Sequence, residues 1–126
     1  MDYASKTLRE MNFDFLGTKQ YAITKETFLP AIAAEDHFFL DVRTDEELKY
    51  STYPWATHIP LQRVPDNLES LPKNKTIVVF CSSLFRASFI WTYLKSKGFE
   101  MVKVLMLSTE EIATQTKPTP LFYLEK

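Results

Sequence analysis

The stretch that decides the fold is residues 76–107, TIVVFCSSLFRASFIWTYLKSKGFEMVKVLML. Its first part, Ile77 to Phe80, is an uncharged run of β-branched and aromatic residues, which predicts a central strand. Its last part, Val102 to Leu107, predicts the next strand. Between them, apolar residues recur at the spacing of one helix face: Ala87, Ile90, Trp91 and Leu94. A strand, a helix and a strand in this order nearly always form a parallel, right-handed crossover.

Three aromatic residues and a glycine define the predicted helix further. Phe85 and Phe89 are expected to widen its apolar face, and Trp91 is expected to belong to the core. Gly98 follows the last turn, where it is expected to take the left-handed conformation that ends many helices.

A second buried strand is predicted at Phe38 to Val42, an apolar run that ends in a charge. Thr44 and Glu47 follow in the pattern of a capping box, which predicts a short helix through Tyr50. Ser108 and Glu111 repeat that pattern and predict the start of a last short helix.

Two further helix boundaries follow from local signals. Thr24 is expected to cap a helix that either begins near Pro30 or is kinked there, because proline inside a helix removes a hydrogen bond. Pro118 and Pro120 are expected to end the last helix. The apolar tail from Leu121 to Leu124 is expected to pack back on the body.

Alternating strands and helices in one small chain predict an α/β fold with a small, mainly parallel central sheet and helices on both faces. Residues 1–20 form a leader that either docks on the body or stays a partly ordered tail, and residues 21–126 form one domain. Ligands of such sheets bind beyond the carboxyl ends of the strands. Asp41 and Cys81 both stand at such an end, which predicts that both lie at the functional edge.

Composition narrows the function. The chain has 126 residues, 45% hydrophobic and 25% charged, with a formal net charge of -1, so no global basic field favours nucleic acid. No apolar run approaches the ~20 residues that cross a bilayer, and a cytoplasmic location without membrane partners is expected. One cysteine and two histidines exclude an internal disulfide and make a poor zinc site. No metal or other cofactor is predicted, and the two glycines cannot build a Gly-rich nucleotide loop.

The segment from Cys81 to Arg86 carries the candidate chemistry. Cys81 ends a strand, and the chain then turns into a helix whose first N–H groups and dipole favour an anion. Arg86 adds guanidinium donors if its side chain turns toward the loop. A thiolate or a persulfide at Cys81 would be stabilised there, and the thiolate is the nucleophilic form of cysteine. The alternative is that Cys81 fills the core, as a lone cysteine after an apolar strand commonly does.

Several ordered motifs resemble those of a known family. From about Ile23 to Leu107 the chain is similar to a single-domain rhodanese. The pieces that carry the resemblance are Phe39-Leu40-Asp41-Val42-Arg43, Glu46-Glu47-Leu48, the segment Tyr53 to Leu61, the strand Ile77 to Cys81, Arg86 with Ser88, and Gly98-Phe99.

The resemblance implies a rhodanese-like fold and a sulfurtransferase or sulfur carrier. Cys81 would bear the persulfide, and the backbone of Ser82, Ser83, Leu84, Phe85 and Arg86 would cradle it. The partners would be a sulfane-sulfur donor and a thiol acceptor, either of which is small or protein-borne. Six residues from cysteine to arginine match the sulfur-transfer members, whereas related phosphatases and arsenate reductases use a loop one residue longer.

Leu84 departs from the pattern, because active members of that family often carry glycine there. A backbone with positive φ at Leu84 would cost about 1–2 kcal/mol. A second hypothesis is therefore a binding or regulatory module that kept the shape and lost turnover, and a third is a cysteine-dependent phosphatase or arsenate reductase. Asp41 and Arg43 are expected to be structural, with Arg43 pairing with Glu47.

Overall fold

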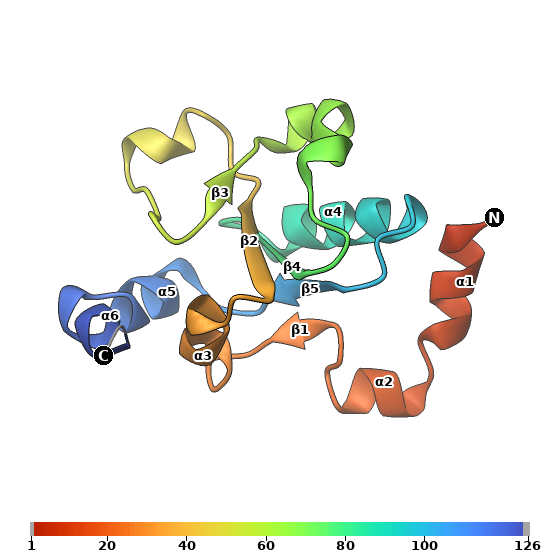
Figure 1. Ribbon diagram of the computed structural model, residues 1–126, viewed down its shortest axis with the longest axis horizontal. Helices are drawn as coiled ribbons and strands as arrows, with labels where there is room; N and C mark the ends of the chain where they lie inside the picture. Colours follow the sequence, from red (N-terminus) through yellow and green to blue (C-terminus); the bar gives the residue numbers. More distant parts are fainter. Residues whose placement is uncertain (1, 125–126) are drawn as a thin grey trace.

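The computed structural model describes residues 2–124, without the side chains of Thr119, Phe122 and Tyr123. Five parallel strands form one sheet in the order β1-β5-β4-β2-β3 (Figure 1). The strands are β1 (Ala22–Ile23), β2 (His37–Asp41), β3 (Thr57–His58), β4 (Thr76–Phe80) and β5 (Val102–Leu105). The predicted α/β fold with a parallel sheet is therefore confirmed.

Helices cover both faces of this sheet. They are α1 (Tyr3–Glu10), α2 (Phe13–Gly17), α3 (Phe28–Ala33), the 3-10 helices η1 (Glu47–Lys49) and η2 (Leu61–Ser70), α4 (Leu84–Ser96), α5 (Thr109–Gln115) and α6 (Pro118–Leu124). Side chains of α4 and η2 share one hydrophobic cluster, and those of α3 and α5 share another.

The two clusters follow from the alternation of side chains along a strand. In β4, Ile77 and Val79 belong to the cluster under α4, whereas Val78 and Phe80 belong to the cluster on the opposite face. All four side chains are buried. An uncharged strand can be buried in this way only where both faces of the sheet are covered.

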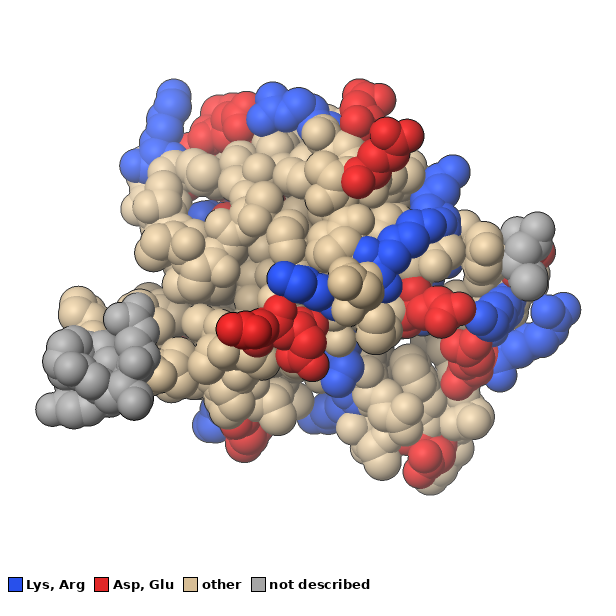
Figure 2. Space-filling view, viewed as in Figure 1, with Lys and Arg blue, Asp and Glu red and all other residues tan. Residues whose placement is uncertain are grey.

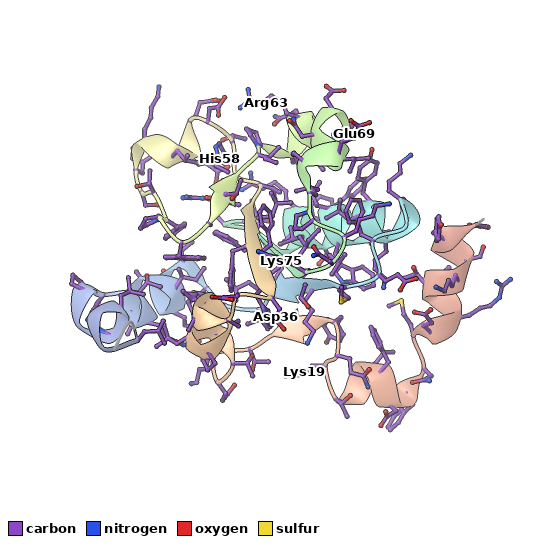
Figure 3. All side chains as sticks on the ribbon, in the orientation of Figure 1. Lys19, Asp36, His58, Arg63, Glu69 and Lys75 are labelled. Carbon is purple, nitrogen blue, oxygen red and sulfur yellow. The ribbon has the colours of Figure 1, made fainter. Side chains whose placement is uncertain are left out.

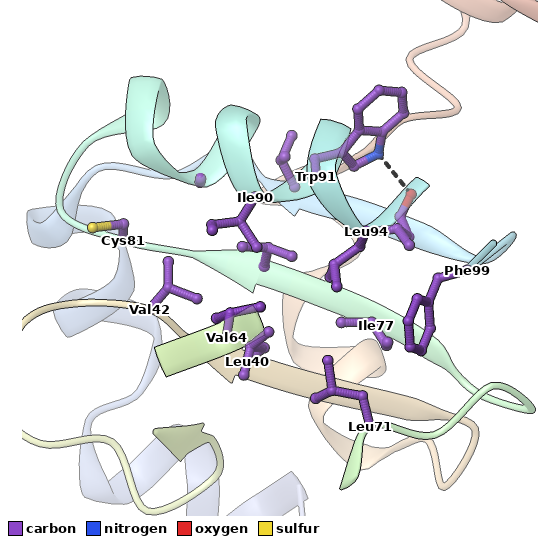
Figure 4. Packing of buried hydrophobic residues seen from close by; sticks show 14 of the residues in the cluster. Leu40, Val42, Val64, Leu71, Ile77, Cys81, Ile90, Trp91, Leu94 and Phe99 are labelled. Atoms are coloured by element: carbon purple, nitrogen blue, oxygen red, sulfur yellow. Dashed lines mark hydrogen bonds between the residues drawn. The ribbon is translucent and has the colours of Figure 1, made fainter. Parts of the chain in front are cut away.

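Helix α4 confirms most of the predicted apolar face. Trp91 is buried, and its indole Nε1 donates a 2.8 Å hydrogen bond to the carbonyl oxygen of Val102 on β5 (Figure 4). Gly98 has a φ of 91° and ends the helix as predicted. The prediction for Phe85 and Phe89 was wrong, because both side chains are exposed on the solvent side of α4.

The N-terminal residues dock on the body as helices. Helix α1 packs against α4, and Thr7 on α1 is buried. Met11 and Phe15 pack against the cluster under α4. The ring of Tyr3 lies 3.2 Å from the position that a Cβ at Gly98 would take, so the chain approaches closely at the end of α4.

The predicted helix cap at Thr24 was wrong, and the helix that was predicted to be the last one is not the last. Thr27, not Thr24, precedes α3, and the Thr24 backbone N–H instead donates to the Thr27 hydroxyl. Pro30 is the third residue of α3, where its missing N–H has no intrahelical partner to lose. The helix that follows Ser108 ends at Gln115, before Pro118, as predicted. It is not the last helix, because Pro118 begins α6 in the first helical position that proline suits.

The predicted packing of the apolar tail is confirmed for part of it. Leu121 and Leu124 line a hollow together with Ile32 of α3 and Trp55; the side chains of Phe122 and Tyr123 lie outside the described residues. Within residues 2–124, no helix combines the length and hydropathy needed to span a bilayer.

The Trp91→Ala substitution is expected to lower the free energy of unfolding by about 3–5 kcal/mol, because it removes a large core side chain and leaves a cavity. The matched control is Phe89→Ala on the exposed side of the same helix, which should change stability by less than about 0.5 kcal/mol. Urea unfolding measures both. Equal effects of the two substitutions would contradict the observed orientation of α4.

Candidate active site

Cys81 directly follows β4 and lies at the carboxyl edge of the sheet. Its side chain is 9% exposed and belongs to the hydrophobic cluster under α4. Figure 4 shows it beyond the end of the strand, beside the first turn of α4. The thiol is therefore held by the core on one side and lies next to a helix N-terminus on the other.

The turn from Cys81 into α4 leaves backbone donors open. Ser83 is the N-cap residue, with φ -136° and ψ 125°, and its side chain makes no capping hydrogen bond. The first N–H groups of a helix have no intrahelical partner. Since Ser83 does not satisfy them, the beginning of α4 retains its capacity to bind an anion.

Leu84 is not strained in this turn. It is the first residue of α4, and Lys19 is the one non-glycine residue with positive φ in the described part of the chain. The condition under which leucine would be costly is therefore absent. The loop reaches its helix without a glycine.

Arg86 is held by a carboxylate rather than turned freely into the loop. Its Nη1 donates to Glu47 Oε1 at 2.7 Å, and its Nη2 donates to Glu47 Oε2 at 3.1 Å. The same Nη2 donates to Ser82 Oγ at 2.7 Å, and the Ser82 hydroxyl donates to Glu47 Oε2. Glu47, Ser82 and Arg86, named here the Glu47 triad, thus tie η1 to both ends of the loop.

The triad shifts two pKa values. The guanidinium of Arg86, followed by hydrogen bonds from Ser82 and Thr44, holds the pKa of Glu47 far below its ordinary value, against the effect of burial. The pKa of Arg86 is raised by the Glu47 hydrogen bond and, more weakly, by negative charge on Cys81. Both groups are therefore charged across the neutral range, and the loop's one guanidinium is electrically compensated.

The Glu47 carboxylate was predicted to cap a helix, and that prediction is half confirmed. It accepts hydrogen bonds from the Thr44 N–H and hydroxyl, both at 3.0 Å. The reciprocal bond is missing, because the Glu47 N–H donates to the Thr44 carbonyl oxygen. Sequence reasoning missed the contact with Arg86, which lies 39 residues away.

The predicted pair of Arg43 with Glu47 was wrong, because Arg43 pairs with Asp41 instead. Its Nη2 lies 2.8 Å from Asp41 Oδ2, and both side chains are at most 5% exposed. Arg43 also donates to Ser51 Oγ at 2.9 Å and lies over the ring of Tyr53. His58 on β3 (Figure 3) contacts the Arg43 carbonyl oxygen through Nε2 at 2.7 Å. The pair therefore fastens the segment after β2, which is consistent with a structural role.

This arrangement can hold an anion on a sulfur atom. Cys81 would supply the nucleophilic atom and α4 the N–H donors, and the Glu47 triad ties the loop to η1. Across residues 2–124, no group of three or more histidine, cysteine, aspartate or glutamate side chains is placed to hold a metal ion.

The Glu47→Gln substitution is expected to reduce stability at neutral pH, because it removes the charge opposite Arg86. A carboxylate whose pKa is lowered by folding stabilises the fold fully at pH values above its pKa in the unfolded chain, which is near 4.5 for glutamate. That contribution is lost as the pH falls toward the lower pKa of the folded state. The difference in melting temperature between wild type and Glu47→Gln should therefore shrink as the pH falls below about 5. A difference that stays constant down to pH 2 would contradict the ion pair.

Comparison with known proteins identifies the family of this chain. Residues 24–115 match the family model described as Rhodanese-like domain. The Bacillus subtilis (strain 168) protein YtwF, named as a sulfurtransferase, is 38% identical over 72 residues, which cover 57% of this chain and 70% of that protein. A sulfurtransferase of Allochromatium vinosum is 29% identical over 68 residues, 54% of this chain and 64% of its own length.

A solved structure agrees with the family match. The rhodanese-like domain protein from Staphylococcus aureus superposes with a TM-score of 0.60 at 32% identity, covering 67% of this chain and 83% of that one. The residues matched to the family, 24–115, contain the strands β2 to β5 and Cys81 at the carboxyl end of β4. On the match over residues 24–115, this chain belongs to the rhodanese-like domain family.

Proposed function

We propose that this chain is a sulfurtransferase that carries sulfane sulfur as a persulfide on Cys81. One observation carries the proposal: the single thiol lies at the carboxyl edge of the sheet, directly before a helix N-terminus whose donors Ser83 leaves open. The sulfurtransferase names of two relatives support the same reaction class.

The proposed reaction balances in atoms and electrons without an oxidant or a reductant. The Cys81 thiolate attacks the terminal sulfur of a donor persulfide, R–S–SH, and a new S–S bond forms at Cys81. The donor's S–S bond breaks, and R–S⁻ leaves with the electron pair. A thiolate acceptor, R′–S⁻, then attacks the terminal sulfur on Cys81, forms R′–S–SH and returns the Cys81 thiolate.

The loop from Ser82 to Arg86 is proposed to bind the terminal sulfur. The open N–H groups at the start of α4 would donate to a persulfide anion, in the way that helix N-termini bind anions. Arg86 would act mainly by positioning, because its hydrogen bonds go to Glu47 and Ser82. Leu84 and Phe85 give the loop an apolar, solvent-exposed rim.

These features bear on the donor and the acceptor. A dianion such as thiosulfate gains little from a guanidinium that Glu47 already compensates, whereas a persulfide on a thiol with apolar surroundings suits the rim. Nucleic acid is not proposed as a partner, because Lys and Arg are interspersed with Asp and Glu on the face shown in Figure 2. A cytoplasmic location is part of the proposal, because a reducing compartment keeps a lone thiol free.

The alternative is a rhodanese-like module that binds a partner without turnover. The near-complete burial of Cys81 and the engagement of Arg86 by Glu47 favour that reading. The open helix N-terminus next to the thiol favours catalysis, and we rank it first for that reason.

Intact-mass spectrometry without reductant should detect the persulfide. After exposure to cysteine persulfide or glutathione persulfide, the wild-type chain is expected to gain one sulfur atom. Cys81→Ser, which changes one atom of the side chain, should gain none. Absence of any gain in the wild type with every donor tested would favour the binding module.

Arg86→Ala is expected to slow this loading by about tenfold or more, since it removes the charge-assisted hydrogen bonds, each contributing ~1.5–3 kcal/mol, that position Ser82 and Glu47. Because Arg86 donates hydrogen bonds to Ser82 and Glu47, Glu47→Gln should also slow loading. Stopped-flow kinetics with a persulfide donor measures both rates. Wild-type rates in both variants would show that the Glu47 triad does not serve the reaction.

The phosphatase hypothesis has its own test. Turnover of p-nitrophenyl phosphate is expected to be absent, because the loop has six residues from Cys81 to Arg86. Phosphate-ester hydrolysis that Cys81→Ser abolishes would refute the argument from loop length.

A further inference from the structure

The first turns of α4 expose an apolar surface without charge. Leu84, Phe85 and Phe89 are 49%, 76% and 65% exposed, and the rings of Phe85 and Phe89 lie 6.5 Å apart between centroids. Ser88 and Thr92 lie beside them on the solvent side of the helix. We name these five residues the α4 surface. Such large apolar side chains commonly lie inside a domain, so their exposure beside a proposed active site needs a reason.

A groove continues this surface toward the N-terminal segment. It has a volume of about 290 Å³, and Leu84, Ser88 and Thr92 form its α4 wall. Met11, Leu16 and Tyr21 form the opposite wall. All three precede the residues matched to the family, 24–115. The docked N-terminal segment therefore builds part of a groove that opens at the proposed persulfide loop.

The charges around this surface exclude several kinds of occupant. No charged side chain lines the groove among the described residues. Arg86, the one charged residue in the first turns of α4, is paired with Glu47. A polyanion, an acidic peptide or a basic peptide finds no complementary charge here. The complementary occupant is apolar and uncharged.

The exposed area separates a transient partner from a stable dimer. An aromatic side chain offers about 150–250 Å², so Leu84, Phe85 and Phe89 together expose roughly 400 Å². Patches of this size on monomers are often functional. A stable interface buries about 800 Å² on each partner, which is roughly twice the area available. A partner that binds briefly, delivers or takes one sulfur atom and leaves is consistent with the smaller area.

We infer that the α4 surface and its groove dock a partner protein through an uncharged segment in which an apolar side chain follows the sulfur-bearing cysteine. Leu84 belongs both to the groove and to the loop after Cys81, so a side chain seated in the groove would bring its neighbouring cysteine to Cys81. The role given to the docked cysteine rests on the proposed sulfur transfer, but the docking itself can be measured without that reaction.

Two hexapeptides test the docking, acetyl-GACFLG-amide and acetyl-GACSNG-amide, each with its cysteine S-methylated so that no sulfur moves. Titrated into the ¹⁵N-labelled full chain, the apolar peptide is expected to bind at least about tenfold more tightly than the polar one, the gain expected from partly burying one large apolar side chain. Its chemical-shift changes should centre on residues 84–92 and on Met11 and Leu16. Equal affinities, or shift changes centred elsewhere, would overturn the inference.

Phe89→Ser and a matched control identify the surface. Phe89→Ser should weaken binding of the apolar peptide by about tenfold and leave the polar peptide unchanged. The control is Phe13→Ser on α2, a residue that is 92% exposed and belongs neither to the α4 surface nor to the groove. It should not change either affinity. Equal weakening by both substitutions would overturn the inference, as would a concentration-dependent dimer that Phe89→Ser abolishes, because the occupant would then be a second copy.

Loading of Cys81 by free cysteine persulfide distinguishes the two proposals. Loading with equal affinity for the two peptides would leave sulfur transfer standing and reject the docking surface. Selective binding of the apolar peptide without any loading would support the docking surface and reject sulfur transfer.

Discussion

The site depends on the parallel pairing of β2 with β4. The two strands are in register along their whole length, with Asp41 opposite Phe80, so both end at the same edge of the sheet. The chain leaves β2 toward Glu47 and leaves β4 toward Cys81 and Arg86. Parallel pairing is what brings these two exits side by side, and the contacts of Glu47 with Ser82 and Arg86 require it. A shift of register by one residue would turn the core side chains of either strand to the other face.

An ion pair follows each of the two strands, but the two pairs differ in burial. After β2, Asp41 and Arg43 form a buried pair whose remaining donors reach Ser51, and this pair fastens the backbone. After β4, Glu47 and Arg86 form a half-buried pair in contact with solvent. The first pair is buried, and the guanidinium donors of Arg43 already bond to Asp41 and Ser51, so the pair has none left for a ligand. The second pair borders the helix N-terminus, where backbone N–H groups remain open to an anion.

Apolar residues complete the functional edge. Core packing uses one side of α4, through Trp91 and its neighbours, and leaves Phe85 and Phe89 in solvent. Under the proposed function, a loop with a compensated arginine and an apolar rim would select against small, highly charged donors. The docked N-terminal segment adds a second wall next to Leu84. The proposed site would therefore combine a cradle of N–H donors for one sulfur atom with an uncharged surface for the molecule that carries that atom.

Local signals in the sequence determined the α/β fold, the central strand, the end of α4 at Gly98 and the capping box at Ser108 and Glu111, because strand alternation, helix spacing and capping act over a few residues. The position of Cys81 at the sheet edge followed from the same signals. Only the tertiary structure decided which partner each charge takes: Arg86 meets a carboxylate 39 residues away, and Arg43 meets Asp41 instead of Glu47. It also decided that Phe85 and Phe89 face solvent, since helix spacing identifies an apolar stripe but not how much of it the sheet covers. Contacts between distant segments depend on strand register and packing, which local sequence does not encode.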